Sequence, residues 1–386
     1  MRVVVAHNRY SSAQPSGENT IVDAEIEQLR TTGVEVVPFL RSSDEITSLP
    51  AAQKALLPLS PIYAGPAQRA LRDLLRARRH DVVHLHNPYP LLSPWVVRTA
   101  HAEGVPVVHT VHNYRQVCAS GVYFRDGGVC TDCLGRTVGV PAVVHACYRG
   151  SRAQSAVMAA ALAVHRPTWR SVDRYIALTD AIAEHLVGIG IAPDRIVVKP
   201  NSVADPGAPE PLGHGFLFLG RLVAEKGLGL LLDAWRSYPV GSLGVLRLAG
   251  DGPMRPAVES AAAQRSDVVF LGSLDKAGVR EAARASSVVL APSVWHDVLP
   301  TVVLEALALG RPVLGTRMGG IPFAVGDAGW VVQPTVEALA AALPVALAEA
   351  PRLAGAARER YLAAFHPDVV TARLLDIYRS LVPSIP

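Results

Sequence analysis

Short runs of β-branched and other apolar residues alternate along the chain with longer segments of helical periodicity, and this alternation constrains the fold more than any other feature. In the first half, the runs expected to form buried strands lie at residues 2–6, 34–38, 81–85, 105–109, 175–178 and 195–198. Segments with helical periodicity, such as 20–31 and 67–78, separate them. Because parallel strands need long crossover connections, the pattern predicts a parallel sheet covered by helices on both faces.

The alternation is interrupted once, at residues 202–211, where three prolines and no periodicity indicate a linker. Beyond it, strands are expected at 216–219, 245–249, 268–271, 288–291 and 312–315. A chain of 386 residues is also long for one core. The sequence therefore predicts an α/β protein of two doubly wound, Rossmann-like domains that face a cleft. Ligands of such sheets bind beyond the carboxyl ends of the strands, so function is expected in the strand-to-helix loops.

Composition excludes several classes of protein. An apolar fraction of 50% with 18% charged residues excludes disorder. The net charge of +4 is dispersed, so nucleic acid is not expected as a partner. The apolar run at residues 1–6 is short for a signal sequence, and the stretch 156–164 is about half of what a spanning helix needs. We expect a cytoplasmic protein without a transmembrane segment, and peripheral membrane contact stays open.

A glycine and two cations follow the expected strand 216–219, within residues 220–227. Arg221 and Lys226 stand five positions apart, at a loop and the following helix start, where they suit a diphosphate gripped from one side. A phosphate leaving group needs such neutralisation because charge grows on its bridging oxygen as the bond breaks. A basic surface turn is the alternative interpretation.

A short helix is expected between Pro300 and Gly310, because proline suits the first helical turn and glycine the residue after a helix. Its N-terminal amides would face the strand-end crevice and suit an anion. Glu305 is the only charge in this helix, and ribose hydroxyls would supply the donors that its carboxylate needs. Alternatively, Thr301 and Glu305 form a solvent-facing stripe. Asp297 would accept from sugar hydroxyls or, alternatively, cap the helix.

In the first half, candidate residues also lie where expected strands end or helices begin. Gly17 opens the first expected helix, where backbone amides suit a phosphate. His84 and His86 end one expected strand, and His109 and His112 end the next. We expect His84 and His109 to be packing or hydrogen-bonding residues, whereas His112 lies past its strand, where a cleft side chain would be.

All four cysteines fall within one segment, at Cys118, Cys130, Cys133 and Cys147. Thiols confined to one stretch of a cytoplasmic chain, two of them as a Cys-x-x-Cys pair, favour a four-thiolate structural zinc site. An iron–sulfur cluster, disulfides or free thiols are the alternatives. The site would stabilise an otherwise irregular, glycine-rich insertion.

The sequence contains no Asp-x-Asp pair, which a transfer reaction using a carboxylate-held divalent ion would normally want. Charge on the phosphates is then expected to be met by Arg221, Lys226 and helix amides. No catalytic metal is therefore expected.

Taken together, these motifs resemble the retaining glycosyltransferases of the GT-B fold, family four, over nearly the whole chain. In the second half the resemblance rests on an ordered set: Gly220-Arg221 with Glu225-Lys226-Gly227, residues 248–253, Asp297 eight positions before Glu305, residues 305–313, and Gly319-Gly320-Ile321-Pro322. In the first half it rests on Asn8-x-Tyr10, Ser16-Gly17-Glu18-Asn19, residues 81–87 and His112-Asn113-Tyr114. The chain looks like the subset that carries a cysteine-rich insertion after the histidine segment.

The resemblance implies roles for the matched positions of the second half. Arg221 and Lys226 would bind the diphosphate of a UDP-, dTDP- or GDP-sugar, and Glu305 its ribose hydroxyls. Asp297 would bind the transferred sugar. The helix start would contact sugar and phosphate through Val298, Leu299, Pro300 and Thr301.

For the first half, the resemblance implies that Gly17 closes on the phosphates and that His112 touches the donor sugar near the reaction centre. It also implies retention of anomeric configuration, with the leaving phosphate helping to deprotonate the acceptor hydroxyl. The acceptor would be a small molecule, such as a secondary metabolite, or an envelope glycan. Three departures leave the donor sugar open: Asp297 replaces the usual glutamate, Phe323 an acid and Ser16 a glycine.

These expectations divide the chain into an acceptor-binding domain at 1–202 with the insertion 118–147, a nucleotide-sugar domain at 214–366, and a helix at 367–386 that packs back on the first domain. The alternatives are a nucleotide-sugar epimerase or a phosphorylase of the same fold, or a noncatalytic partner protein.

Overall fold

The computed structural model describes residues 1–13 and 16–382, which form two compact units. The first unit consists of Met1–Tyr123, Thr131–Pro200 and the C-terminal segment from Val370. The second consists of Phe124–Cys130 and Asn201–Val369. Between 201 and 215 the chain has no helix or strand, as the proline-rich composition predicts.

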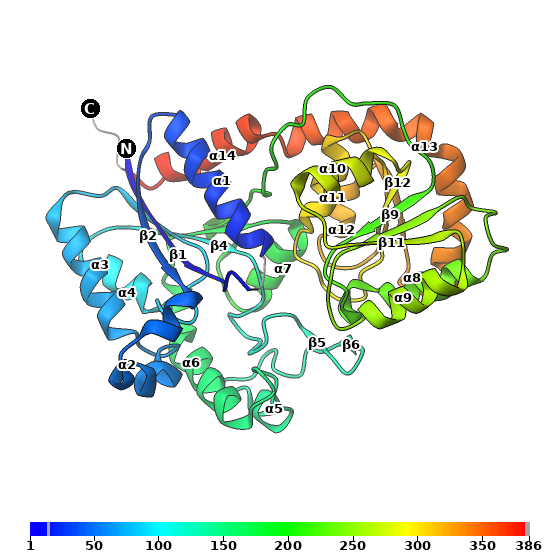
Figure 1. The fold of residues 1–386 in the computed structure, drawn as a ribbon. Coiled ribbons are helices and arrows are strands. Elements are labelled where there is room, and N and C mark those ends of the chain that lie inside the picture. The colour runs from blue at the N-terminus through cyan, green and yellow to red at the C-terminus, as the bar shows by residue number, and fades with distance from the viewer. Residues whose placement is uncertain (14–15, 383–386) are drawn as a thin grey trace. The chain divides into compact units, whose positions relative to one another are not determined.

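The first unit contains a six-stranded sheet in the order β2-β1-β3-β4-β7-β8, in which all neighbouring strands are parallel (Figure 1). Its strands are β1 (Arg2–Arg9), β2 (Glu35–Ser42), β3 (Val82–Leu85), β4 (Val107–Val111), β7 (Arg174–Ala177) and β8 (Ile196–Val198). Its helices are α1 (Gly17–Thr31), α2 (Ala51–Leu56), α3 (Gly65–Ala77), α4 (Trp95–Ala102), α5 (Val140–Val144), α6 (Arg152–Arg170), α7 (Asp180–Gly188) and α14 (Pro367–Arg379). The reversal of strand order lies between β1 and β3, where ligands of such sheets bind.

The core of the first unit is continuous with its last helix. Valines of β1 and β3 and apolar residues of α1 pack with Leu374, Ile377 and Tyr378 of α14. These three side chains of α14 are at most 5% exposed. At about 25 cal/mol per Å² of apolar surface, burial of this kind supplies most of the favourable free energy of folding.

The second unit contains a parallel sheet in the order β11-β10-β9-β12-β13-β14. Its strands are β9 (Phe216–Leu219), β10 (Leu246–Ala249), β11 (Val268–Gly272), β12 (Val288–Ala291), β13 (Val313–Thr316) and β14 (Gly329–Val332). Its helices are α8 (Leu228–Arg236), α9 (Arg255–Gln264), α10 (Lys276–Arg284), α11 (Thr301–Ala308), α12 (Ile321–Val325) and α13 (Val336–Ala364). This is the doubly wound order of a Rossmann sheet, with the reversal between β9 and β12.

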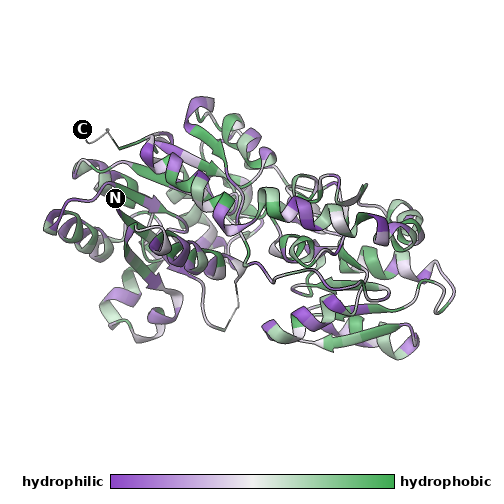
Figure 2. Cartoon of the chain, turned by 90° about the horizontal axis from the view of Figure 1, so that it is seen from above, coloured by the Kyte–Doolittle hydropathy of each residue, from purple (hydrophilic) through white to green (hydrophobic). Residues whose placement is uncertain are grey.

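Hydropathy explains why these strands are central. Figure 2 shows strands that are mostly hydrophobic and helices that alternate between polar and apolar residues, which is the pattern of a sheet covered on both faces. β3, β4 and β12 are buried at every position. Helices and strands therefore form where the alternation predicted them, and the α/β, doubly wound class is confirmed.

Two features were not predicted. β14 is half-buried along its whole length and lies at the sheet edge, and we did not predict it although Trp330, Val331 and Val332 form a short apolar run. The cysteine-rich insertion contains a hairpin of β5 (Phe124–Arg125) and β6 (Gly128–Val129) as well as α5, although we expected irregular structure there.

The helical stretch Val336–Arg379 is long and apolar enough to cross a membrane by length and composition. The core helix of a globular domain can pass the same test. In α13, Leu339, Leu343, Ala346 and Ala350 pack into the core of the second unit. That packing accounts for the apolar character of α13.

Candidate active site

The strand-order reversal of the second unit brings together the two loops that the sequence singled out. The segment 220–227 follows β9, and the segment 292–300 follows β12, which is hydrogen-bonded to β9. The carboxyl ends of adjacent parallel strands lie at the same edge of the sheet, so both loops start there.

Glycines allow these loops to pack backbone against backbone. Gly227 has φ +74°, and a Cβ atom there would lie 1.8 Å from the carbonyl oxygen of Pro292. Gly250 packs as closely, since a Cβ atom on it would lie 1.9 Å from the carbonyl oxygen of Gly220. The Val294 amide donates to the Glu225 carbonyl at 3.0 Å. The segment that carries Lys226 is thus held in place by backbone contacts.

Lys226 and Asp297 form a close ion pair, with 2.5 Å between Nζ and Oδ2. The Asp297 side chain is largely buried, and Ser293 Oγ lies 3.4 Å from the same carboxylate oxygen. Lys226 Nζ also lies 5.7 Å from the centroid of the Trp295 ring. The lysine therefore carries its charge between a carboxylate and an aromatic face.

Asp297 is not the cap of α11, because the residue before that helix is Pro300. The Asp297 backbone instead contacts the double glycine: the Gly320 amide donates to the Asp297 carbonyl at 2.6 Å, and a Cβ at Gly319 would lie 2.2 Å from that oxygen. The capping interpretation is therefore wrong, and the Asp297 carboxylate faces Lys226.

The N-terminus of α11 offers amide groups to a ligand. Val298, Leu299 and Pro300 are buried and Thr301 is half-buried. Within the described chain, no carbonyl accepts a hydrogen bond from the amides of Val298, Leu299 or Thr301. Unpaired amides and the helix dipole make such a terminus suitable for an anion. Gly310, with φ +69°, follows the helix, as the sequence predicted.

Arg221 and Glu305 are the exposed charges of this group. Arg221 Nη2 lies 3.7 Å from Glu225 Oε1 and is otherwise accessible. Glu305 is accessible, as a solvent-facing stripe would require. Desolvation by the surrounding protein nevertheless raises the pKa of its carboxyl, whereas the charge of Lys276 lowers it. Among the residues in the described ranges, none donates a hydrogen bond to the Glu305 carboxylate, and only desolvation and the charge of Lys276 act on it. Its hydrogen-bonding capacity is available to a ligand.

In the first unit, the loops after β1 and β3 start where the strand order reverses. Gly17 is the first residue of α1 and is exposed. A pocket of about 250 Å³ of empty volume is lined there by His86, His112 and nine further residues, which include Glu18, Asn87 and Arg115. The structure therefore brings His112 and the start of α1 together at one edge of this sheet.

His112 is held by another histidine. His86 Nδ1 lies 2.9 Å from His112 Nε2, so one ring donates to the other. Burial, together with neighbouring His86 and His7, holds the pKa of His112 well below its ordinary value, which makes its imidazole neutral at pH 7. His84 and His109 are buried and hydrogen-bonded, the former to Thr110 and the latter to the Leu85 carbonyl, as expected for packing residues.

A buried ionic cluster lies behind these histidines, and the sequence analysis missed it. Lys199 Nζ lies 2.9 Å from Glu25 Oε2, and Glu25 Oε1 lies 3.2 Å from His84 Nδ1 and 3.3 Å from His86 Nε2. Burial alone would raise the pKa of Glu25, but Lys199 and the two histidines hold it well below its ordinary value. The cluster supports His86, which in turn contacts His112.

Glu18 belongs to the segment Ser16-Gly17-Glu18-Asn19, but the sequence analysis gave it no role of its own. It accepts from the Tyr10 hydroxyl at 3.1 Å through Oε2, while its buried Oε1 has no hydrogen-bond partner among the described residues. Burial raises the pKa of its carboxyl to about 7, against Arg115, which lowers it. A carboxyl of that pKa beside His112 is suited to proton exchange near neutral pH. The sequence signal that could have identified Glu18 was its position in the first turn of a helix that follows a strand.

Among the described residues, one group of three side chains lies close enough to share a metal ion, namely Glu25, His84 and His86. Lys199 already supplies positive charge to Glu25, and His84 Nδ1 lies 2.6 Å from the Tyr378 hydroxyl. These contacts fit an ionic network better than a metal site.

The four cysteines are half-buried. Cys133 and Cys147 pack beside a small apolar cluster that contains Tyr89 and Met158. In the described part of the chain, no three cysteine sulfurs lie within 4.8 Å of one another. The zinc site therefore stays a prediction.

Comparison with known families identifies both halves of the chain. A family model described as "Glycosyl transferase 4-like domain" matches residues 3–202, and one described as "Glycosyl transferases group 1" matches residues 213–349. A phosphatidyl-myo-inositol mannosyltransferase of Mycobacterium leprae is 26% identical over 411 residues, which cover 97% of this chain and 96% of that relative. A D-inositol 3-phosphate glycosyltransferase of an Arthrobacter species is 27% identical over 341 residues, which cover 82% of this chain and 77% of that one.

Solved structures share the fold. HepE from Anabaena in complex with UDP has a TM-score of 0.68 and 14% identity, covering 98% of this chain and 100% of that one. Sucrose-phosphate synthase from Thermosynechococcus elongatus has a TM-score of 0.71 and 19% identity, covering 98% of each chain. These matches confirm the GT-B fold. The chain is thus a glycosyltransferase that belongs to the glycosyl transferase 4-like family, with a group 1 domain in its second half.

Proposed function

We propose that the protein transfers a sugar from a nucleoside diphosphate sugar to a hydroxyl group of its acceptor, with retention of anomeric configuration and without a catalytic metal. The observation that carries this proposal is the group around Lys226. One edge of one sheet presents two cations, unpaired helix amides and an accessible carboxylate, and these are the groups that a sugar nucleotide needs.

The diphosphate is assigned to Arg221, Lys226 and the N-terminus of α11. Guanidinium and ammonium groups form charge-assisted hydrogen bonds with phosphate oxygens, and the helix amides add neutral donors. Glu305 lies one turn into that helix, where it can accept from both ribose hydroxyls. Ribose binding would satisfy a carboxylate that has no donor among the described residues.

Asp297 is assigned to the transferred sugar. Without ligand, its carboxylate is neutralised by Lys226 at 2.5 Å. When a phosphate accepts hydrogen bonds from the same Lys226 ammonium group, lone pairs of the Asp297 carboxylate become available to sugar hydroxyls. The pair therefore couples recognition of the phosphate to recognition of the sugar.

In the reaction, the bond between the anomeric carbon and the phosphate oxygen breaks as the bond to the acceptor oxygen forms on the same face. The nucleoside diphosphate leaves with the electron pair, and the acceptor proton passes to its phosphate oxygen. Arg221 and Lys226 stabilise the growing negative charge. Neutral His112 is assigned to donor-sugar contact and Gly17 to phosphate contact through its amide.

UDP-sugars are the first donors to test, because HepE of the same fold is described in complexes with UDP and with UDP-glucose. For the acceptor, the proposal names a hydroxyl of a secondary metabolite or of an envelope glycan. We further propose that the insertion 118–147 holds structural zinc, for which its thiolates would have to converge.

The test is a donor screen followed by variants. Thermal shift against UDP-, dTDP- and GDP-sugars identifies the donor, since a ligand at 100 times its Kd stabilises by about 2.7 kcal/mol. Arg221→Ala, Lys226→Ala and Glu305→Ala should then each abolish transfer, while Arg236→Ala, an exposed arginine on α8, should leave it unchanged. Unchanged turnover in all three site variants would contradict the proposal.

A further inference from the structure

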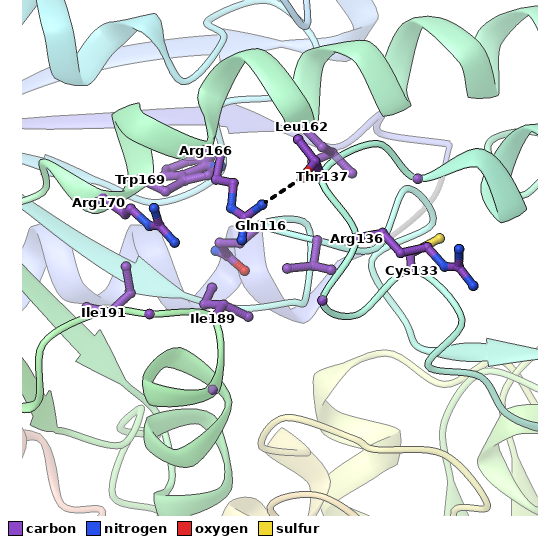
Figure 3. A pocket seen from close by; sticks show the side chains of 15 residues that line it. Gln116, Cys133, Arg136, Thr137, Leu162, Arg166, Trp169, Arg170, Ile189 and Ile191 are labelled. Carbon is purple, nitrogen blue, oxygen red and sulfur yellow. Dashed lines mark hydrogen bonds between the residues drawn. The ribbon is translucent and has the colours of Figure 1, made fainter.

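The first unit contains a second hollow, to which the proposed transfer assigns no role. Its empty volume is about 790 Å³, including solvent at its mouth, and it is bounded by α6, the end of α7 and residues 133–139 of the insertion (Figure 3). We call it the arginine pocket because three arginines line it. The lining residues used below are Gln116, Arg136, Thr137, Arg166, Trp169 and Arg170.

The arginine pocket is strongly basic. Its lining contains three arginines and no aspartate or glutamate. In the described part of the chain none of the three forms an ion pair with an acid: Arg136 donates to the Asp132 backbone carbonyl and Arg166 to the Thr137 hydroxyl. Figure 3 shows Arg166 and Arg170 extending from α6 on the same side of the hollow, with Arg136 at its other end. Uncompensated positive charge in a concave space attracts anions.

Two of these arginines stand at an unfavourable helical spacing. Arg166 and Arg170 are four residues apart on α6, where like charges repel. Arg166 donates to the Thr137 hydroxyl at 3.3 Å, and Arg170 lies against Gly190, where a Cβ would come within 3.2 Å of Nη2. The side chains are thus placed by packing and a neutral hydroxyl while their charge is left unneutralised.

Two buried polar atoms in the lining also lack partners. Gln116 is 8% exposed and Trp169 is 3% exposed. Gln116 Oε1 and Trp169 Nε1 form no hydrogen bond within the described ranges. Buried polar atoms without partners are rare because each costs free energy, so a ligand with both donors and acceptors would relieve that cost.

The arginine pocket adjoins the pocket of His112, since Gln116 and Trp169 line both hollows. A ligand anchored on Arg166 and Arg170 would therefore lie against residues that also line the pocket of His112 and Glu18. Under the proposed function, the acceptor is the substrate that the first unit binds.

We propose that the arginine pocket binds a phosphate group carried by the acceptor, an inference that rests on the proposed function. Arginine forks match phosphate oxygens bidentately. The hydroxyl-bearing part of the acceptor then lies against Gln116 and Trp169. The pocket would make this enzyme select phosphorylated acceptors over their neutral counterparts.

The binding test uses inorganic pyrophosphate and fluorine NMR of the full chain labelled with 5-fluorotryptophan. The chain has five tryptophans, of which Trp169 reports on the arginine pocket and Trp295 on the Lys226 site. We expect a saturable shift of the Trp169 resonance that is lost in Arg166→Gln/Arg170→Gln. It should persist in Arg152→Gln, a matched change of an exposed arginine at the start of α6.

A response confined to Trp295, or a Trp169 shift that the double variant retains, would overturn the proposal. Folding of the variant is checked in the same spectra, because Trp235 lies in the core of the second unit and half-buried Trp95 is the first residue of α4 in the first unit. The sugar-nucleotide screen is read separately at Trp295. Failure of the proposed function would appear there as no response to any donor, independently of Trp169.

The acceptor arm measures nucleoside diphosphate release with matched alcohols, glycerol 3-phosphate against glycerol and glucose 6-phosphate against glucose. We expect at least one phosphorylated member to react about 10-fold faster than its neutral twin, equivalent to about 1.4 kcal/mol. Arg166→Gln/Arg170→Gln should remove that preference and leave donor hydrolysis by water unchanged. Equal rates for both members of each pair in the unmodified enzyme would refute the acceptor assignment.

Discussion

The Glu18 carboxyl makes the stability of the protein depend on pH. Burial raises its pKa from 4.5 to about 7 in the folded protein. Between these values the folded state binds more protons than the unfolded state, so stability falls as pH rises through this window. The full effect is about 3 kcal/mol, since one pKa unit corresponds to about 1.4 kcal/mol.

Replacing Glu18 by glutamine removes the ionisation and keeps an acceptor for the Tyr10 hydroxyl. The variant should therefore gain stability over the unmodified protein as pH rises, by about 2 kcal/mol between pH 5.5 and pH 8. Urea unfolding at several pH values measures this difference. Glu27→Gln is the control, because Glu27 lies on the same helix but is exposed.

A Glu18→Gln variant whose stability difference is the same at pH 5.5 and pH 8 would refute the reasoning. It would mean that the carboxylate is solvated in the folded protein or is fully neutralised by Arg115. A difference that grows equally in Glu27→Gln would refute it as well, since the effect would then belong to the whole helix.

Three further predictions concern other parts of the molecule. Lys199→Met should destabilise by about 3–5 kcal/mol in urea unfolding because it leaves Glu25 buried without its cation, and adding Glu25→Gln should recover most of the loss. Gly227→Ala should weaken donor binding at least about 10-fold by calorimetry, because its Cβ would collide with Pro292, whereas Gly229→Ala, with no atom nearby, should leave Kd unchanged. Elemental analysis should find about one zinc per chain, and finding neither zinc nor iron would retire the metal site.

Local patterns predicted the architecture well. The strand runs and the linker are read from neighbouring residues, and the structure has them at nearly the predicted bounds. The same holds for the helix before Gly310, because its start and stop signals are adjacent in sequence. β14 was missed although Trp330, Val331 and Val332 form a short apolar run like those of the predicted strands.

The polar network of the first unit was beyond sequence reasoning. Glu25 and Lys199 are 174 positions apart, and each by itself resembles an ordinary surface charge. His86 was placed at a strand end, but its link to His112 depends on how β3 and β4 pair. Similarly, the sequence did not indicate that Arg166 and Arg170 form a site, because the opposite wall of the arginine pocket comes from the insertion. Long-range pairing therefore decides which charges become functional candidates.

The most direct test of the central claim is a crystal structure of the protein with its donor sugar nucleotide. We predict that the diphosphate lies within hydrogen-bond distance of Arg221 and Lys226, with the ribose hydroxyls on Glu305. A sugar nucleotide that binds with full occupancy away from Lys226 and Glu305 would contradict the account.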